Sequence, residues 1–416
     1  MNIFDYVILY SLIVIWLIIL INVILVIGGY FYYLDIMNTK LDESLDEYPF
    51  VSVLVPAHNE GKVIEKTARS LLEIEYPKNR YEVIIINDNS SDNSAEILAR
   101  VKKEYSDRNF IIINTDKNTG GKGKSTALNI GFSKSKGEIL AVYDADNTPE
   151  KEALKYLTQT LIKDDNLGAV IGKFRCRNKN VNILTSFINI ETLTFQWMAQ
   201  AGRWKLFKLC TIPGTNFVIR RSILEEINGW DTKAITEDTE LSFRIYRMGY
   251  KIKFMPSAVT WEQEPQTLNV WFKQRSRWAK GNTYVVIKNF KYLFDKTAGA
   301  TRFDIFYYIL IYFFFLSATI VSDAIFVLGA IGLVHINILG YNTILWIMAY
   351  SVFVLSILVA ISTEKGELTI KNTFVVMLMY FTYCKLWGIV AALGFYNYLK
   401  DVIFKREAKW YKTERF

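Results

Sequence analysis

The sequence predicts an α/β domain, built on a doubly wound and mostly parallel sheet, that is embedded between transmembrane helices. Two observations predict this architecture. Short apolar runs typical of buried strands alternate with helical patterns over residues 50–265, and long uncharged runs precede and follow that region. Residues AVILMFWYC make up 51% of the 416-residue chain, but charged residues keep an ordinary 22% share, so the apolar excess must be concentrated in particular segments.

Residues 1–40 are predicted to form an N-terminal transmembrane helix. The run from Tyr6 to Leu34 carries no charge, and it is long enough to cross about 30 Å of hydrocarbon at roughly 1.5 Å per helical residue. A cleaved signal peptide is the alternative. Its apolar core would be shorter, a basic segment would precede it, and a cleavage site of small residues would follow Gly28-Gly29-Tyr30. We therefore expect the helix to stay in the mature protein.

Residues 301–400 are predicted to form a C-terminal transmembrane region. Two membrane spans fit the apolar runs, from Ile305 to Leu333, which Asp323 interrupts, and from Thr343 to Ser362. A third apolar segment, Thr373 to Leu399, contains Lys385 near its middle. A charge at that depth marks this segment as unusual.

The tail, residues 401–416, is rich in Lys and Arg, which the positive-inside rule keeps in the cytosol. If the α/β domain is cytosolic and every apolar segment crosses once, the tail would lie outside. A bent or re-entrant segment around Cys384–Gly388 would resolve the conflict, because irregular backbone and a charge are tolerated in the membrane where they line a cavity. We therefore predict a bend there and a basic cytosolic tail.

Four strand-like runs of the α/β domain are each followed by a polar loop. The runs are Phe50–Val55, Tyr81–Asn87, Asn109–Ile113 and Ile139–Tyr143. The loops are Pro56-Ala57-His58-Asn59-Glu60, Asp88-Asn89-Ser90-Ser91-Asp92, Gly120-Gly121-Lys122-Gly123-Lys124 and Asp144-Ala145-Asp146. Because ligands of such sheets bind beyond the carboxyl ends of the strands, these loops together predict a ligand site.

The charges in these loops suit a ligand that carries phosphate. Asp144 and Asp146 could hold Mg²⁺ or Mn²⁺ against a diphosphate, although loop acids are often only solvated or cap a helix. Lys124 could belong to an ATP-binding P-loop, but the first glycine of that motif would fall on Asn118, and the loop follows the third strand rather than the first. We interpret Lys124 as a single cation near a ligand phosphate.

Two further motifs follow later in the chain. Thr236-Glu237-Asp238 fits a helix N-terminus, with Thr236 as the N-cap, and it also fits a carboxylate held in place as a general base. Residues 266–300 mix aromatic and basic side chains and are predicted to form amphipathic helices on the cytosolic membrane face. They contain the second of these motifs, Gln274-x-x-Arg277-Trp278.

Together these motifs resemble the inverting family-2 glycosyltransferases of the polysaccharide-synthase type, which include cellulose, hyaluronan, chitin and poly-N-acetylglucosamine synthases. The resemblance covers roughly residues 50–285. It rests on the Pro56–Glu60 loop, Asp88, Lys124 before Ala127-Leu128-Asn129, the Asp144 and Asp146 pair, Thr236-Glu237-Asp238 and Gln274-x-x-Arg277-Trp278. It implies that residues 50–265 form a cytosolic glycosyltransferase-A domain.

The resemblance also implies a role for each matching residue. Pro56, Ala57, His58, Asn59, Glu60, Asp88, Lys124 and Asp144 would bind the nucleotide sugar, and Asp146 would bind Mg²⁺ or Mn²⁺. Asp238 matches the general base. Gly214, Thr215, Asn216, Glu237, Gln274, Arg277 and Trp278 would hold the acceptor and the diphosphate. Trp197, Trp204 and Trp230 could stack on sugar rings, although aromatics at such positions more often belong to the core.

The function implied by the resemblance is a multi-pass cell-membrane enzyme that polymerises and exports a β-linked polysaccharide. UDP-N-acetylglucosamine is the favoured donor and UDP-glucose the next. A non-processive transferase that moves one sugar to a lipid, and a sugar-nucleotide sensor without turnover, are the alternatives. The expected partners are the UDP-sugar, the growing glycan and the lipid bilayer, and an export or accessory subunit is left open. Nucleic acid is not expected, because the basic residues gather in the interfacial stretch and the tail.

Overall fold

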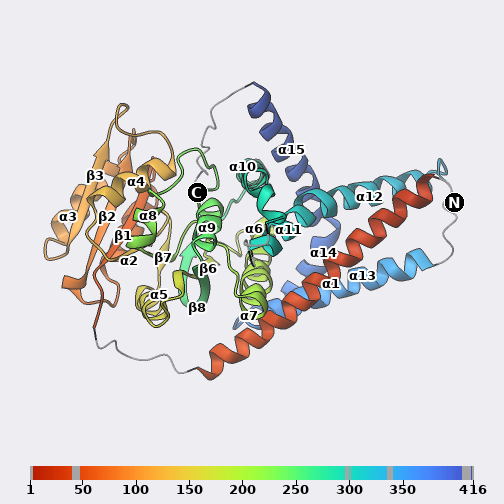
Figure 1. The fold of residues 1–416 in the computed structure, drawn as a ribbon, viewed down its shortest axis with the longest axis horizontal. Coiled ribbons are helices and arrows are strands. Elements are labelled where there is room, and N and C mark those ends of the chain that lie inside the picture. Colours follow the sequence, from red (N-terminus) through yellow and green to blue (C-terminus); the bar gives the residue numbers. More distant parts are fainter. Residues whose placement is uncertain are drawn as a thin grey trace. The chain divides into compact units, whose positions relative to one another are not determined.

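The computed structural model describes residues 3–39, 47–295, 299, 301–334, 341–404 and 414. These residues divide into two compact units. The helical unit comprises Met1–Ile36, Leu193–Phe207 and Arg275–Phe404, and the sheet unit comprises Met37–Thr192, Lys208–Gln274 and Lys405–Phe416. Most of the predicted basic tail, 401–416, lies outside the described residues. Figure 1 shows the elements of both units.

The described part of the sheet unit forms an eight-stranded sheet in the order β3-β2-β1-β4-β7-β6-β8-β5 (Figure 1). The strands are β1 Val51–Ala57, β2 Tyr81–Asp88, β3 Phe110–Thr115, β4 Ile139–Val142, β5 Thr148–Pro149, β6 Leu167–Cys176, β7 Phe217–Arg220 and β8 Lys251–Glu262. β1 runs parallel to both β2 and β4, and β2 runs parallel to β3. This half of the sheet confirms the predicted parallel arrangement.

The other half makes the sheet mixed. β7 runs antiparallel to β4 and β6, β6 and β8 are parallel, and the short β5 is antiparallel to β8. The α/β class predicted from the sequence is confirmed, and only the share of parallel pairing is smaller than expected. β1, β2 and β4 are buried over nearly their whole length, as expected for strands that are covered on both faces.

Helices connect the strands and carry part of the candidate site. Those of the sheet unit are α2 Ile64–Leu72, α3 Ser94–Glu104, α4 Lys124–Lys134, α5 Ala153–Ile162, α8 Arg221–Glu226 and α9 Glu237–Arg247, with the short 3₁₀ helix η1 Lys78–Arg80. α4 packs on β1 and β2, and α5 packs on β6, β7 and β8. The first residues of α4 and α9 are the ones that reach the candidate site.

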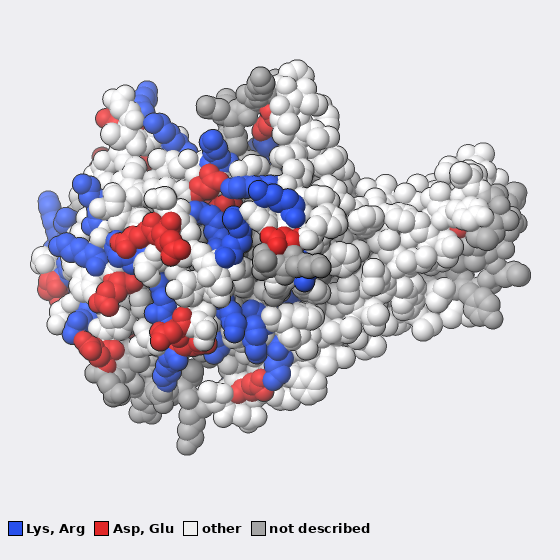
Figure 2. All heavy atoms as spheres, viewed as in Figure 1, with Lys and Arg blue, Asp and Glu red and all other residues white. Residues whose placement is uncertain are grey.

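Among the described residues of the helical unit, three helices are long and apolar enough to cross a membrane: Ile3–Asn38 (α1), Thr301–Gly329 and Ile344–Ser362. The elements of this unit, with the two helices that link it to the sheet unit, are α6 Ile183–Thr194, π-helix η2 Phe195–Gly202, α7 Arg203–Phe207, α10 Leu268–Asn289, η3 Phe290–Leu293, α11 Thr301–Ile309, π-helix η5 Leu310–Phe315, α12 Leu316–Ala330, α13 Tyr341–Ser362, α14 Ile370–Phe381 and α15 Tyr383–Ile403. The surface of α1, α12 and α13 seen in Figure 2 is almost free of charged side chains, as membrane contact requires.

Residues Leu193–Phe207 belong to the helical unit, although the sequence places them inside the α/β domain. Close packing against α1 explains the difference. A Cβ atom on Gly29 would collide with the carbonyl oxygen of Trp197, and one on Gly202 would collide with the backbone of Leu25. Glycines at these contacts let the backbones of α1 and η2 approach each other, as in membrane helix pairs.

The bend predicted near Lys385 is present, slightly earlier in the chain. α14 and α15 meet at Thr382 with a bend of 44°. The Lys385 Nζ atom lies 2.7 and 2.9 Å from the two carboxylate oxygens of Asp323 on α12. The two charges that interrupt the apolar C-terminal segments therefore neutralise each other, which lowers the cost of placing them in a membrane.

Candidate active site

The loop after β1 is fastened to the loop after β2. The Asn59 backbone N–H donates to Ser90 Oγ at 2.9 Å, and the Ser91 N–H donates to Asn59 Oδ1 at 2.7 Å. His58 Nδ1 lies 2.6 Å from the carbonyl oxygen of Asp88. Pro56 and Ala57 are the last residues of β1, and the Glu60 side chain is buried. The Pro56–Glu60 loop and the loop that begins at Asp88, both predicted to bind the nucleotide sugar, thus form one structure.

Asp88 connects this structure to the glycine-rich loop after β3. Its Oδ1 atom accepts hydrogen bonds from Thr115 Oγ1 at 2.7 Å and from the Gly121 N–H at 2.8 Å. A Cβ atom on Gly120 would collide with Asp88 Oδ1. A glycine at this position therefore lets the loop lie directly on the Asp88 carboxylate.

Lys124 is the first residue of α4 and the centre of an ionic cluster. Its Nζ atom lies 2.6 Å from Asp144 Oδ1 and 3.3 Å from Glu237 Oε1, and it donates to the Gly214 carbonyl oxygen at 2.7 Å. Burial alone would lower the pKa of Lys124, but the neighbouring carboxylates, Asp144 foremost, outweigh it and raise the pKa above its usual value. Lys124 is therefore a permanent cation at this edge of the sheet.

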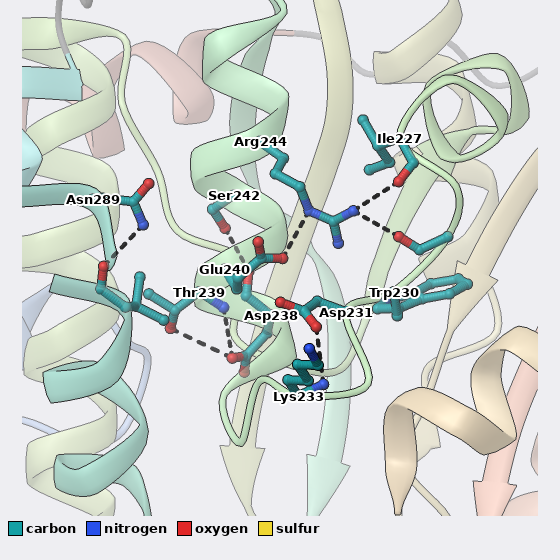
Figure 3. Close-up of polar contacts among 12 residues, drawn as sticks. Ile227, Trp230, Asp231, Lys233, Asp238, Thr239, Glu240, Ser242, Arg244 and Asn289 are labelled. Atoms are coloured by element: carbon teal, nitrogen blue, oxygen red, sulfur yellow. Dashed lines mark hydrogen bonds and ion pairs between the residues drawn. The ribbon is translucent and has the colours of Figure 1, made fainter. Parts of the chain in front are cut away.

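Asp238, the second residue of α9, lies beside the same glycine. A Cβ atom built on Gly214 would be 2.7 Å from Asp238 Oδ2 and 3.4 Å from Lys124 Nζ. Asp238 Oδ1 accepts a hydrogen bond from the Thr239 N–H at 2.6 Å (Figure 3). The lysine predicted to face a phosphate and the carboxylate predicted to act as a base therefore meet across Gly214.

The loop carrying Asp144 and Asp146 is held from two sides. The Asp144 N–H donates to Thr215 Oγ1 at 3.0 Å, and the Thr215 hydroxyl donates in turn to the Asn147 side chain. On the other side, the Gln263 N–H donates to Asp146 Oδ2 at 3.3 Å. The sequence did not predict Gln263, because a backbone donor leaves no signature in residue types.

The residues around Asp146 fit a metal ion that is held jointly by the protein and a phosphate-bearing ligand. The described residues contain no group of three or more His, Cys, Asp or Glu side chains that could hold a metal. Mg²⁺ is commonly held by one or two carboxylates together with substrate phosphates rather than by a cage of protein ligands. Because Asp144 is paired with Lys124, Asp146 is the carboxylate that we expect to contribute.

Four of the residues predicted to hold the acceptor and the diphosphate have no contact with the ionic cluster around Lys124 among the contacts described above. Asn216 is fully buried, and its amide donates to the carbonyl oxygens of Lys173 and Ala258, so it fastens its loop to the sheet. Gln274 lies in α10 at the boundary of the sheet unit, and Arg277 and Trp278 belong to the helical unit. The sequence also missed a neighbour of Trp278: the buried Arg275 guanidinium lies 4.0 Å from the centre of its ring.

Other aromatic and basic residues of the chain have structural contacts. Trp197, Trp204 and Trp230 are buried, as expected for core residues. Arg177, which was not singled out in the sequence, donates to the carbonyl oxygens of Asp146 and Trp261. Its contacts link the loop of the carboxylate pair to the end of β8.

Comparison with known proteins gives matches to one kind of enzyme. Residues 49–281 match the family model described as "glycosyltransferase like family 2". The chain is 47% identical to a probable glycosyltransferase, YdaM, of Bacillus subtilis, over 98% of this chain and 97% of that protein. It is 34% identical to the poly-β-1,6-N-acetyl-D-glucosamine synthase of Staphylococcus aureus, over 61% of this chain and 60% of that protein.

A solved structure has the same fold. The mannosyltransferase PcManGT from Pyrobaculum calidifontis, in complex with GDP-Man and Mn²⁺, superposes with a TM-score of 0.63 at 20% identity, over 92% of this chain and 99% of that chain. At this identity the likeness concerns the fold alone, which is the GT-A fold.

Proposed function

Because the chain belongs to the family-2 glycosyltransferases, we propose that it is a processive, inverting synthase that builds a β-linked polysaccharide from a UDP-sugar in the membrane. The proposal rests on one observation: Lys124 and Asp238 both lie beside Gly214. It places a permanent cation and a carboxylate at one point, where the donor diphosphate and the acceptor hydroxyl would have to meet.

The donor would lie over the loops after β1, β2 and β3. The Asp88 carboxylate, with the Pro56–Glu60 loop, would hold the nucleoside, and Lys124 with Asp144 would face the diphosphate. Asp146 would hold Mg²⁺ or Mn²⁺, which supplies positive charge to the leaving diphosphate. We favour UDP-N-acetylglucosamine because a relative at 34% identity is named for that sugar, and UDP-glucose comes next.

The acceptor hydroxyl would be activated by Asp238. A sugar hydroxyl is a weak nucleophile, and a carboxylate that accepts its proton during attack lowers the barrier. Attack opposite the leaving UDP converts an α-linked donor into a β-linked product. Gly214, Thr215 and Glu237 would border the acceptor, and Lys124 would stabilise the charge that grows on UDP.

Chain growth without release would depend on Gln274, Arg277 and Trp278, which match the motif of the processive enzymes. The buried Arg275 beside Trp278 holds the indole ring in place, which suits an aromatic surface for a sugar ring. The membrane helices would then export the product. A lipid-directed transferase of the same fold could lack this motif, and a sensor would need no base, so Asp238 favours an enzyme.

α14 and α15 each pack along a different neighbouring helix of the helical unit. Within the helical unit, α14 runs antiparallel to α13, since Trp346 and Tyr350 meet Phe381 and Met377 respectively. α15 runs antiparallel to α12 and the preceding η5, since Lys385 pairs with Asp323 and Phe395 meets Phe313. The chain turns by only 44° between α14 and α15, a bend that fits both a broken span and a re-entrant segment. We propose the re-entrant segment, with both its ends on the cytosolic side, because it keeps the basic tail in the cytosol.

Single cysteines in a variant without Cys176, Cys210 and Cys384 would test this topology. We expect Leu368→Cys, between α13 and α14, and Glu414→Cys, in the tail, to react with a membrane-impermeant maleimide from the same side. Leu333→Cys, after α12, should react from the opposite side. Labelling of residue 414 together with residue 333 would show that α14 and α15 cross the membrane.

The function itself is tested with purified protein in lipid vesicles, given Mg²⁺ or Mn²⁺ and each of several radiolabelled UDP-sugars. We expect UDP release and a long polymer from one donor. Trp278→Ala should keep UDP release but shorten the product, because the acceptor end loses its aromatic contact. A short or lipid-linked product from the unsubstituted protein would instead identify a non-processive enzyme, and binding of UDP-sugar without UDP release would identify a sensor.

A further inference from the structure

The loop Ile227–Trp230 is held on one side by Asn129 of α4. The Trp230 backbone N–H donates to Asn129 Oδ1 at 2.9 Å, and Asn129 Nδ2 donates to the Trp230 carbonyl oxygen, also at 2.9 Å. Only one orientation of the amide makes both bonds, so the two contacts fix each other. The Trp230 ring is buried and packs edge to face on the Phe132 ring of α4, with 6.2 Å between the ring centres.

Arg244 of α9 holds the same loop from the other side (Figure 3). Its Nη1 atom donates to the carbonyl oxygens of Ile227 at 3.0 Å and Gly229 at 2.8 Å. Its Nε atom donates to Glu240 Oε2 at 2.7 Å, and the Glu240 side chain is buried. A charged hydrogen bond at a buried site is strong, so Arg244 has a fixed place on its own helix.

The backbone of the loop is shaped for these contacts. Gly229 has a φ of +75°, and a Cβ atom there would collide with Asn129 Oδ1. Any larger residue would push the asparagine away from the loop and strain the backbone at the same time. The loop is thus built to be held closely by α4.

These contacts close a ring of which Lys124 and Glu237 of the candidate site are part. α4 begins at Lys124 and α9 begins at Glu237, and these two residues form an ion pair at 3.3 Å. More than one turn further along each helix, Asn129 and Arg244 bind the same four-residue loop. Two helices joined at two points along their length have a fixed spacing and a fixed crossing angle.

We propose that Asn129 and Arg244 are positioning residues that set the place of Asp238 relative to Lys124. This inference rests on the proposed roles of these two residues in transfer. Neither Asn129 nor Arg244 would touch the substrate. Their loss would let the start of α9 move away from the start of α4, so that the base no longer meets the acceptor hydroxyl while the donor is still bound.

The test compares Asn129→Asp and Asn129→Ala in the vesicle assay with the donor that supports turnover. Asn129→Asp keeps the acceptor for the Trp230 N–H but loses the donor to its carbonyl oxygen, and Asn129→Ala loses both. Because misplacement by about 1 Å can cost about a hundredfold in rate, we expect kcat for transfer to fall at least tenfold, more in Asn129→Ala. KM for the donor should stay within about twofold, since the donor loops are unchanged.

A second readout separates positioning from general weakening of the fold. If the base is displaced while Lys124 still faces the diphosphate, water can replace the acceptor, so the fraction of UDP-sugar that is hydrolysed to free sugar should rise. Arg220→Ala is the matched control. Like Arg244, Arg220 donates to backbone carbonyl oxygens, those of Leu161 and Leu167. In the sheet, however, it lies opposite Ile139, the first residue of β4, and so at the end of that strand away from the site.

We expect Arg220→Ala to lower the melting temperature while kcat per folded molecule and the hydrolysed fraction stay unchanged. If Asn129→Asp and Asn129→Ala also lose activity only in step with folded protein, and hydrolysis does not rise, the positioning role is wrong. Asp238→Asn in the same assay keeps this outcome apart from a failure of the proposed function. Full transfer by Asp238→Asn would show that Asp238 is not the general base, independently of the result for Asn129.

Discussion

Asp238→Asn is expected to lower the rate of sugar transfer by about 10²- to 10⁴-fold, the usual contribution of a general base. The amide keeps the size of the side chain but cannot accept the acceptor proton. Its oxygen can still accept the Thr239 N–H, so the first turn of α9 should keep its structure. The measurement is the initial rate of UDP release and polymer formation, together with UDP affinity, which should change little.

Asp164→Asn serves as the control for this substitution. Asp164 undergoes the same chemical change, but its carboxylate accepts hydrogen bonds from Asn166 in a loop before β6, and that loop contains no predicted site residue. We expect it to retain normal transfer. Normal transfer by Asp238→Asn as well would show that another group accepts the proton, and loss of UDP binding in Asp238→Asn would show that the residue serves the donor instead.

The sequence predicted the part of the site that depends on strand order. Polar residues after successive parallel strands must share one edge of a sheet, and the loops that carry Glu60, Asp88, Lys124 and Asp146 do so. The antiparallel β7 was less predictable, because Phe217–Arg220 is a short apolar run whose direction depends on the chain's return through the sheet. Its preceding loop nevertheless brings Gly214 to Lys124.

Contacts made by backbone atoms could not be predicted from the sequence. The Gln263 N–H on Asp146 and the two bonds of Asn129 to Trp230 involve main-chain groups, which every residue carries. Asn129 was noticed only as part of the Ala127-Leu128-Asn129 motif. The placement of Leu193–Phe207 with the helical unit was missed for a similar reason, because glycine contacts leave no period in the apolar pattern.

Lys124→Met is expected to lower kcat for transfer by about 10²- to 10³-fold, the cost of removing one fixed donor from a site where negative charge develops. Lys124 is a cation throughout the usable pH range because its pKa is raised, so its loss acts at every pH rather than by titration. The variant also leaves Asp144 and Glu237 without their shared counter-charge. We therefore expect the melting temperature to fall as well, because the acids lose their partner; the initial rate of UDP release and the thermal transition are measured together.

Three further variants show whether this effect is chemical or structural. Lys134→Met removes the same charge from the exposed end of α4 and should keep normal transfer. Lys124→Met combined with Glu237→Gln removes one of the two acids that lose their counter-charge, so it should recover part of the melting temperature but not the rate. Lys124→Arg keeps the charge in a planar group that cannot reproduce the three contacts of the ammonium, and we expect partial activity. If the double variant recovers transfer together with stability, Lys124 only holds the fold and the donor diphosphate must be stabilised by other groups.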